Sequence, residues 1–342
     1  MGYQARGRPP MGWRTLAVRD FIRVPFPAAR TTAASGLRIR AIAGRLGWGE
    51  RAIKWSAGPT TPGLLSLSRV RGTKATPGAE GLPPTTLDDL ARLLSRVVGI
   101  SLRGGLDGRL AAGLDEAARA AREPVAVFAR RALARQGAAL EELVEHVVVL
   151  ETVFWRHGEQ LATVGRLAAT ARGPLSIWSA GCATGEVAYS VAIALLEVGR
   201  GGMGDRILGT DVSRRALERA RIGAYGVRAV RRLPSPLARR WLDGGPVELR
   251  VKDEARALVS FAPYNLVGGG SAPGGPFDVV LCPNVFIYFD PDAAVRAVRR
   301  LAGALAPGGR LVLGPAELPI GEAAGLVPIR AGGVTLLARI EG

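Results

Sequence analysis

The chain has 342 residues and a formal net charge of +17, with 48% hydrophobic and 22% charged residues. That length suffices for two domains with substantial cores, and the composition is that of an ordinary globular protein. Two cysteines give no disulfide framework, and two histidines without Cys or His neighbours at ligand spacing argue against a metal site. No apolar run is long enough to span a bilayer and none opens the chain as a signal peptide would, so we expect a cytoplasmic protein without membrane insertion.

Residues 1–84 hold most of the positive charge. Up to residue 80 there are fourteen basic and three acidic residues, so +11 of the net charge falls in this segment. Prolines interrupt every candidate element. We interpret the segment as a disordered basic extension or as sequence upstream of the true start codon, with an arm that binds acidic lipid or nucleic acid as the functional alternative. Because the charge is concentrated in this extension and not in the rest of the chain, it does not indicate a nucleic-acid substrate, and the expected interpretation includes no nucleic-acid partner.

Residues 85–165 are expected to form a small helical domain with a linker. Thr85 or Thr86 can cap a first helix, because apolar residues recur at helical spacing after them. These residues are Leu87, Leu90, Leu93, Leu94, Val97 and Val98. Further helices are predicted over residues 109–121, 124–135 and 140–150.

The stretch Glu151-Thr-Val-Phe-Trp-Arg156 comes next. Taken alone, its two aromatic residues are interpreted as core and Arg156 as a member of a surface ion pair. His146 and His157 flank this stretch, and each is interpreted as a helix-surface or local hydrogen-bonding residue.

Residues 176–196 predict a strand, a tight turn and a helix. An apolar run ends at Gly181, Gly185 follows, and the pattern then becomes helical. Glycines let a backbone turn sharply beside a ligand, while the free N–H groups of the new helix face the loop. The spacing lacks both the dinucleotide fingerprint and the Gly-Lys-Ser/Thr of a P-loop, so it indicates a nucleotide-like ligand without naming it.

The next strand, Arg206–Asp211, ends on an acidic residue. In a βαβ unit this position brings a carboxylate against ribose hydroxyls. A glycine turn, an acid after the second strand and no phosphate-binding lysine favour adenosine with a sulfonium tail. The sequence therefore predicts S-adenosyl-L-methionine as cofactor, with S-adenosyl-L-homocysteine as product.

The rest of the chain alternates strands and helices. Ser213 can cap a helix over residues 214–222. Residues 247–251 and 257–261 are interpreted as a hairpin. A strand ending at Cys282 is expected beside the one ending at Cys182, then a helix over residues 290–305 and a strand over 310–314. A closing antiparallel hairpin over 326–330 and 334–339 completes the pattern of a doubly wound, Rossmann-like methyltransferase domain over residues 166–342.

Several motifs occur in one order and together resemble the CheR family of chemotaxis-receptor glutamate O-methyltransferases. They are Trp178-Ser-Ala-Gly-Cys-Ala-Thr-Gly-Glu186, Gly209-Thr-Asp211, Ala220-Arg-Ile-Gly-Ala-Tyr225, Asn265-Leu266 and Cys282-Pro-Asn-Val-Phe-Ile-Tyr-Phe289. The resemblance runs from about Leu87 to the C-terminus. It implies methyl transfer to glutamate carboxylates on the cytoplasmic helical region of chemoreceptors, giving methyl esters for sensory adaptation. It also implies a monomer and a small β subdomain at about residues 226–260, which in some members binds a receptor peptide by strand addition.

The resemblance also implies site residues. Arg156 is expected to bind the acceptor carboxylate and Tyr288 to align it. Cofactor contacts are expected from Thr152, Arg156, Gly181, Glu186, Asp211, Asn265, Leu266, Pro283 and Asn284. In the family the helical domain faces the receptor with basic residues, for which the candidates are Arg103, Arg109, Arg119 and Arg122, although a solvated helix face is the better interpretation of each.

The chain departs from the family at four positions. Leu150, Pro283, Val187 and Ala188 stand where the family commonly has Asn, Arg, Glu and Pro. These departures keep two alternatives open: a methyltransferase with another protein or a small molecule as acceptor, and a degenerate cofactor-binding signalling module.

Overall fold

The computed structural model describes residues 82–101 and 107–340. Nearly all of the basic extension expected over residues 1–84 lies outside this part. Four helices begin the described part, as the apolar periodicity predicts: α1 (Pro84–Val98), α2 (Asp107–Ala121), α3 (Val125–Leu133) and α4 (Ala139–Val147). They pack around buried side chains that include Leu94, Leu114 and Phe128. The expected threonine cap of α1 is wrong, because the helix starts at Pro84 and no side chain caps it.

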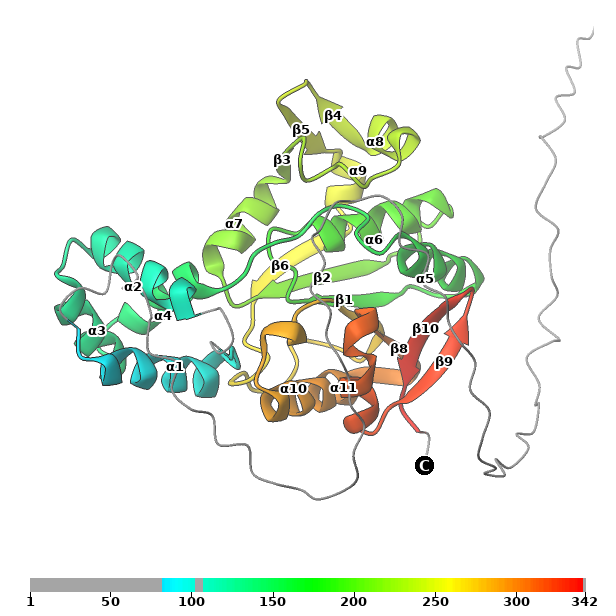
Figure 1. The fold of residues 1–342 in the computed structure, drawn as a ribbon. Helices are drawn as coiled ribbons and strands as arrows, with labels where there is room; N and C mark the ends of the chain where they lie inside the picture. Colours follow the sequence, from blue (N-terminus) through cyan, green and yellow to red (C-terminus); the bar gives the residue numbers. More distant parts are fainter. Residues whose placement is uncertain (1–81, 102–106, 341–342) are drawn as a thin grey trace, which may run out of the picture. The chain divides into compact units, whose positions relative to one another are not determined.

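A seven-stranded sheet forms the second part, with strand order β6-β2-β1-β7-β8-β10-β9 (Figure 1). Five neighbouring strands are parallel, and β10 runs antiparallel to both β8 and β9. The strands are β1 (Ser176–Ala180), β2 (Arg206–Asp211), β6 (Val259–Pro263), β7 (Phe277–Cys282), β8 (Leu305–Leu313), β9 (Val327–Ala331) and β10 (Val334–Ala338). This confirms the doubly wound methyltransferase fold and its closing hairpin. The strands before Cys182 and Cys282 are neighbours, as expected, and both thiols are free and buried.

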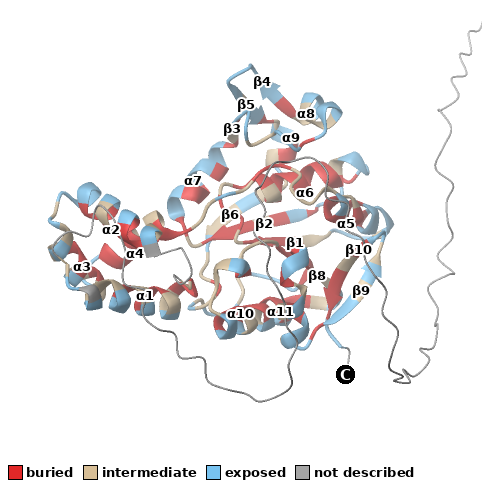
Figure 2. Ribbon diagram, in the orientation of Figure 1, coloured by how far each residue is buried: buried red, intermediate tan, exposed pale blue. Residues whose placement is uncertain are grey.

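Helices cover both faces of this sheet. Ile177 packs into the cluster with α5 (Gly158–Thr170) and α6 (Glu186–Glu197), whereas its neighbour Trp178 packs with α10 (Pro291–Gly303) and α11 (Leu318–Ala323). Successive side chains of a strand point to opposite faces, so a strand buried on both sides has no polar face. The central strands β1 and β7 are buried along most of their length, which explains their continuous apolar runs. The edge strand β9 is largely exposed, as its pale blue colour in Figure 2 shows.

A small three-stranded sheet is inserted after α7 (Arg214–Ile222). Its order is β3-β5-β4, from the strands Ala224–Gly226, Glu248–Val251 and Leu242–Gly244, with α8 (Ser235–Trp241) between β3 and β4. The hairpin expected from residues 247–251 and 257–261 is wrong. After β5 the short helix α9 (Asp253–Arg256) reverses the chain, and β6 leaves the small sheet to pair in parallel with β2.

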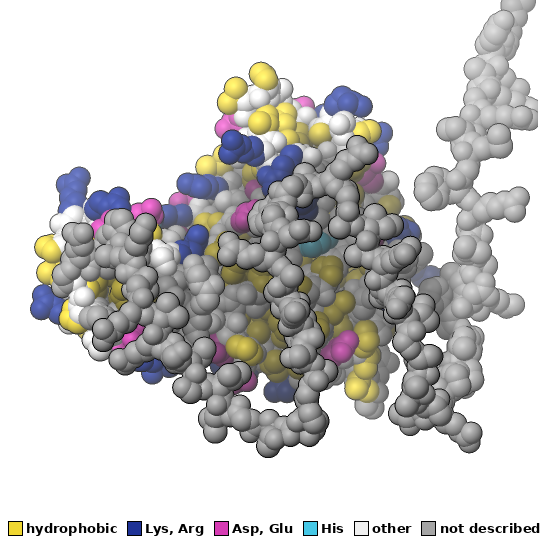
Figure 3. Space-filling view, viewed as in Figure 1, with side chains coloured by type: hydrophobic (Ala, Val, Ile, Leu, Met, Phe, Trp, Pro, Cys, Tyr) yellow, Lys and Arg dark blue, Asp and Glu magenta, His cyan; other side chains and the backbone are white. Residues whose placement is uncertain are grey.

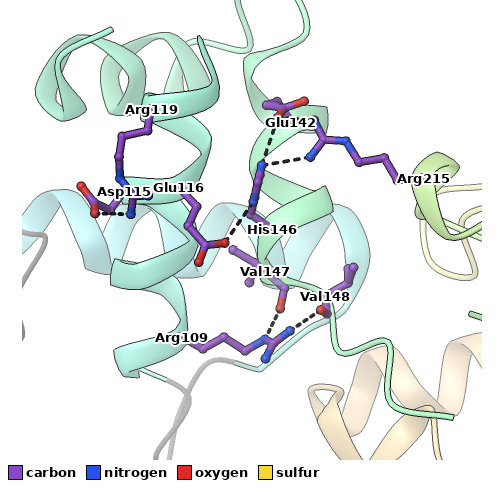
Figure 4. A network of polar contacts seen from close by, with 9 residues as sticks. All are labelled: Arg109, Asp115, Glu116, Arg119, Glu142, His146, Val147, Val148 and Arg215. Atoms are coloured by element: carbon purple, nitrogen blue, oxygen red, sulfur yellow. Dashed lines mark hydrogen bonds and ion pairs between the residues drawn. The ribbon is translucent and has the colours of Figure 1, made fainter. Parts of the chain in front are cut away.

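Helices α4 and α7 are joined by polar contacts (Figure 4). Glu142 pairs with Arg215, and His146 lies 3.1 Å from Glu142 and 3.2 Å from Glu116, which agrees with a local hydrogen-bonding role. Ser213 caps α7, as predicted, by accepting from the N–H of Ala216. Within residues 82–101 and 107–340, no helix has the length and apolar character needed to cross a membrane.

Candidate active site

A cavity opens beyond the carboxyl ends of β1, β2 and β7. In open parallel sheets this is where ligands bind. One wall comes from the helical part, through Val98, Ile100 and Val148. The sequence-predicted residues that line the cavity are Thr152, Arg156, Gly181, Asp211, Asn265, Leu266, Pro283, Asn284 and Tyr288.

The floor of the cavity is the turn between β1 and α6. Gly181 has φ 67°, and a Cβ there would meet the Val285 side chain at 2.6 Å, so only glycine fits without a shift. Asp211, at the end of β2, accepts from the N–H of Ala183 (2.8 Å) and of Ser213 (2.9 Å). Burial raises the pKa of its carboxyl group above the ordinary value, although the backbone hydrogen bonds oppose this. Two backbone donors thus hold this carboxylate against the cavity.

Glu186 is the one predicted site residue that does not line this cavity. It begins α6 and is only 4% exposed, and its Oε2 accepts from the Thr184 hydroxyl at 2.7 Å. Burial raises the pKa of this carboxyl group. The carboxylate therefore lies behind the glycine turn.

The segment before α5 supplies two lining residues. Thr152 Oγ1 is buried and has no hydrogen-bond partner among the residues that the structure describes. The Arg156 guanidinium donates to the backbone carbonyl of Glu151 at 3.0 Å, which leaves other N–H groups of the guanidinium free, and the residue lines the cavity. Arg156 therefore has no ion pair within the described part of the chain. The surface ion pair expected from the residues alone is wrong.

The loop after β7 carries Pro283, Asn284 and Tyr288. Asn284 has φ 60°, a left-handed conformation that is uncommon for a residue with a side chain. Trp155 (φ 59°) and Ala183 (φ 47°) are also left-handed and lie in or next to cavity-lining segments. Such conformations gather at functional sites, where the surrounding structure holds them in place.

Two residues that the sequence did not assign to the site hold this loop. Glu317, which is fully buried, accepts from the N–H groups of Asn284 (2.7 Å), Gly314 (2.8 Å) and Phe286 (2.7 Å). His157, half-buried, lies 2.6 Å from Asn284 through its Nε2. The Asn284 amide donates here, and Nε2 of the neutral ring accepts. A signal for Glu317 was its charge shortly after the apolar end of β8. Nothing in the sequence indicated the contact between His157 and Asn284.

Asn265 and Leu266 follow β6. The Asn265 amide already donates to the Val97 carbonyl at 2.8 Å and accepts from Val267 and Gly268, so it also shapes its own turn. One N–H of the amide stays available to a ligand. Leu266 is buried, at 7% exposed, and presents an apolar surface to the cavity.

These groups fit an adenosine ligand with a sulfonium tail. Asp211 offers a carboxylate for hydroxyl groups, Leu266 an apolar surface for a base, and Thr152 an unsatisfied hydroxyl that a ligand would pair. The Gly181 turn leaves room for close approach. In the described part of the chain, no three His, Cys, Asp or Glu side chains come together as a metal site.

Comparison with known proteins agrees with this geometry. Residues 151–323, half of the chain, match the family model described as CheR methyltransferase, SAM binding domain. The chain is 36% identical over 185 residues to chemotaxis protein methyltransferase 1 of Vibrio cholerae serotype O1, which covers 51% of this chain and 66% of that protein. It is also 39% identical over 150 residues to a chemotaxis protein methyltransferase of Vibrio parahaemolyticus. This match covers 42% of this chain and 54% of that protein.

A third relative is named for another process. The probable biofilm formation methyltransferase WspC of Pseudomonas aeruginosa is 35% identical over 198 residues, which covers 56% of this chain and 47% of that protein. The chain thus spans between about half and two thirds of the length of these three relatives. The match to the family model, over the segment that carries the cavity, shows that the chain belongs to the CheR methyltransferase family and contains its S-adenosylmethionine-binding domain.

Proposed function

We propose that this protein transfers a methyl group from S-adenosyl-L-methionine to glutamate carboxylates of chemoreceptors. The observation that carries the proposal is one cavity, in the family's cofactor-binding domain, that is lined by both Arg156 and Tyr288. The names of the Vibrio relatives support chemotaxis as the process. The bound cofactor supplies an electrophilic methyl group, so the protein has to bring a nucleophile to it in the right orientation.

A glutamate side chain is already ionised near neutral pH, so the reaction needs no general base. Arg156 binds the acceptor carboxylate with N–H groups that the Glu151 carbonyl leaves free. The guanidinium holds the carboxylate in place, and positioning of this kind supplies several kcal/mol of rate enhancement. The apolar wall of Val98, Ile100 and Val148 removes water from the carboxylate.

The cofactor-binding roles follow the lining of the cavity. Asp211 binds the ribose hydroxyls, Asn265 and Leu266 lie against the adenine, and Thr152 pairs with the methionine end. Asn284 and Pro283 complete the site through the loop after β7, and Tyr288 aligns the acceptor. Gly181 leaves room for the cofactor. Glu186 does not line the cavity, and it supports the cofactor-binding turn between β1 and α6 through its hydrogen bond with Thr184.

The partner in this proposal is the cytoplasmic helical region of a chemoreceptor, and the enzyme acts as a cytoplasmic monomer. The products are a glutamate methyl ester and S-adenosyl-L-homocysteine. Methylation of receptor glutamates serves sensory adaptation.

Transfer of labelled methyl groups to purified receptor cytoplasmic fragments tests the proposal. Wild-type protein should label the receptor fragment, and mild base should release this label. The Arg156→Ala variant should not label the fragment. Arg172→Ala is the matched control, because Arg172 is exposed and lies before β1, at the opposite end of the sheet. Saturable cofactor binding without label on a competent receptor fragment would refute the proposed acceptor.

A further inference from the structure

The stretch from α7 to the end of α8 carries a concentrated positive charge. Residues 214–240 contain nine arginines and a single acidic residue, Glu218, for a net charge of +8. All nine arginines are exposed, and in Figure 3 dark blue side chains gather over α7, β3 and α8. Within the part that the structure describes, Arg215 and Arg240 form ion pairs and the other seven do not.

The sequence of the helical part has no comparable excess of positive charge. Residues 84–150 hold nine arginines and nine acidic residues, so their net charge is zero. Arg109 donates to the backbone carbonyls of Val147 and Val148, and Arg119 pairs with Asp115. The helical part therefore has little attraction for an acidic partner at long range.

Three of the arginines without an ion pair lie in one turn that contacts the segment before α5. The turn that carries Arg228, Arg231 and Arg232 is anchored by Leu233, which is buried. Its Ala229 carbonyl accepts from the N–H of Phe154 at 2.9 Å. The Arg232 guanidinium donates to the backbone carbonyl of Arg156 at 3.4 Å. The turn is thus fastened to the segment whose Arg156 side chain lines the cavity.

The sequence of this turn separates its two faces. Ala229 and Val230 pack against the core of the catalytic domain, while the arginines on either side of them point to solvent. We name the exposed set Arg228, Arg231 and Arg232 the arginine turn. Packing sets the backbone position of the turn, and its arginine side chains are exposed and form no ion pair within the described residues.

We propose that the arginine turn is the docking surface for the acidic, glutamate-bearing helix of the acceptor protein. The inference rests on the proposed function, because an acceptor that is methylated on glutamates brings carboxylates to the mouth of the cavity. Arginine binds carboxylates in a planar, bidentate manner, and clustered positive charge speeds the encounter with an acidic surface. Docking by this turn replaces the role that the family resemblance gave to the helical domain.

The test compares two double charge reversals. Arg228→Glu with Arg231→Glu changes the arginine turn and leaves Arg232 and its contact to the Arg156 carbonyl in place. Arg122→Glu with Arg130→Glu makes the same change in charge at exposed positions of the helical part. Binding of a purified receptor cytoplasmic fragment is measured without cofactor at several salt concentrations, and cofactor binding and thermal unfolding are measured for each protein.

Wild-type protein and the helical-part variant should bind the fragment with an affinity that falls as salt rises. The turn variant should bind about tenfold more weakly and with a smaller dependence on salt, while its cofactor affinity and unfolding temperature stay unchanged. Equal binding by both variants, or wild-type binding to anionic phospholipid vesicles or duplex DNA but not to the fragment, would overturn the docking proposal. Salt-dependent binding through the turn without methyl transfer by the wild type would instead refute the proposed function alone.

Discussion

The unsatisfied hydroxyl of Thr152 leads to a prediction in which stability and cofactor binding change in opposite directions. Thr152 Oγ1 is buried in the lining of the cavity and has no partner among the described residues. Thr152→Val replaces the hydroxyl by a methyl group of similar size. The free protein should gain stability, because the substitution removes a buried polar atom that forms no hydrogen bond.

The expected magnitudes follow from this change. A buried hydroxyl without a partner costs about 1–3 kcal/mol, so the free energy of unfolding should rise by about 1 kcal/mol or more. The same substitution removes the hydrogen bond that a bound ligand would make to Thr152 and leaves the ligand's polar group unpaired. That loss of about 1–3 kcal/mol corresponds to a Kd for S-adenosylmethionine that is about 5- to 150-fold higher.

Urea unfolding of the free protein and calorimetric titration with the cofactor measure the two effects. Thr163→Val is the matched control, because Thr163 is also buried but its hydroxyl donates to the Glu159 carbonyl and accepts from Arg166. The control should lose stability and keep its cofactor affinity. A Thr152→Val protein that is less stable than the wild type, or that binds the cofactor equally well, would refute the reasoning.

Three further predictions concern residues that hold the site or the sheet. Glu317→Gln turns one acceptor oxygen into a donor that faces backbone N–H groups. The free energy of unfolding in urea should therefore fall by about 1.5–3 kcal/mol, and calorimetry should show a weaker cofactor affinity. Wild-type values in both measurements would contradict this prediction. Arg200→Met leaves the buried carboxylate of Asp205 without its guanidinium and should cost about 3–5 kcal/mol in the same unfolding assay; a loss below about 1 kcal/mol would count against it. Burial lowers the pKa of His157 below its ordinary 6.5, so the unfolded chain takes up the proton first, and the free energy of unfolding of the wild type should fall as the pH drops from about 6.5 through the lowered pKa. His157→Gln should lack this decrease, and a difference between the two proteins that stays constant from neutral to mildly acidic pH would disprove it.

Local patterns in the sequence were enough for most of the fold. The strand, the glycine turn and the helix around Gly181 each depend on a few consecutive residues, and so does the acidic residue that ends β2. Local sequence was therefore sufficient to predict them. Buried parallel strands produce continuous apolar runs, which made β1 and β7 recognisable. The order of these units was enough to predict the doubly wound sheet.

The error at residues 247–261 has a physical cause. β5 and β6 are both short strands, and the local sequence of a short strand does not specify the strand with which it pairs. One turn of helix, α9, sends β6 to the parallel edge of the central sheet, where β2 is its partner. Pairing between segments about fifty residues apart is decided by tertiary packing, which periodicity does not contain.

The residues that hold the loop after β7 escaped prediction for the same reason. His157 is 127 residues from Asn284 in the chain, and Glu317 is 33 residues from it. Asn265 shows the opposite case, since its side chain lies at the cavity as expected but also holds a turn and the Val97 carbonyl. One side chain can thus hold a turn and line the cavity at the same time.

Mass spectrometry of the methylated acceptor shows whether the methyl group is transferred to glutamate carboxylates. A purified chemoreceptor cytoplasmic fragment is incubated with the wild-type protein and S-adenosylmethionine, digested, and compared before and after mild base. Each modified peptide should carry the mass of one added methyl group on a glutamate, and base should remove it. Base-stable methylation on nitrogen or sulfur, or a fragment that stays unmodified while the cofactor is consumed on another acceptor, would contradict this prediction.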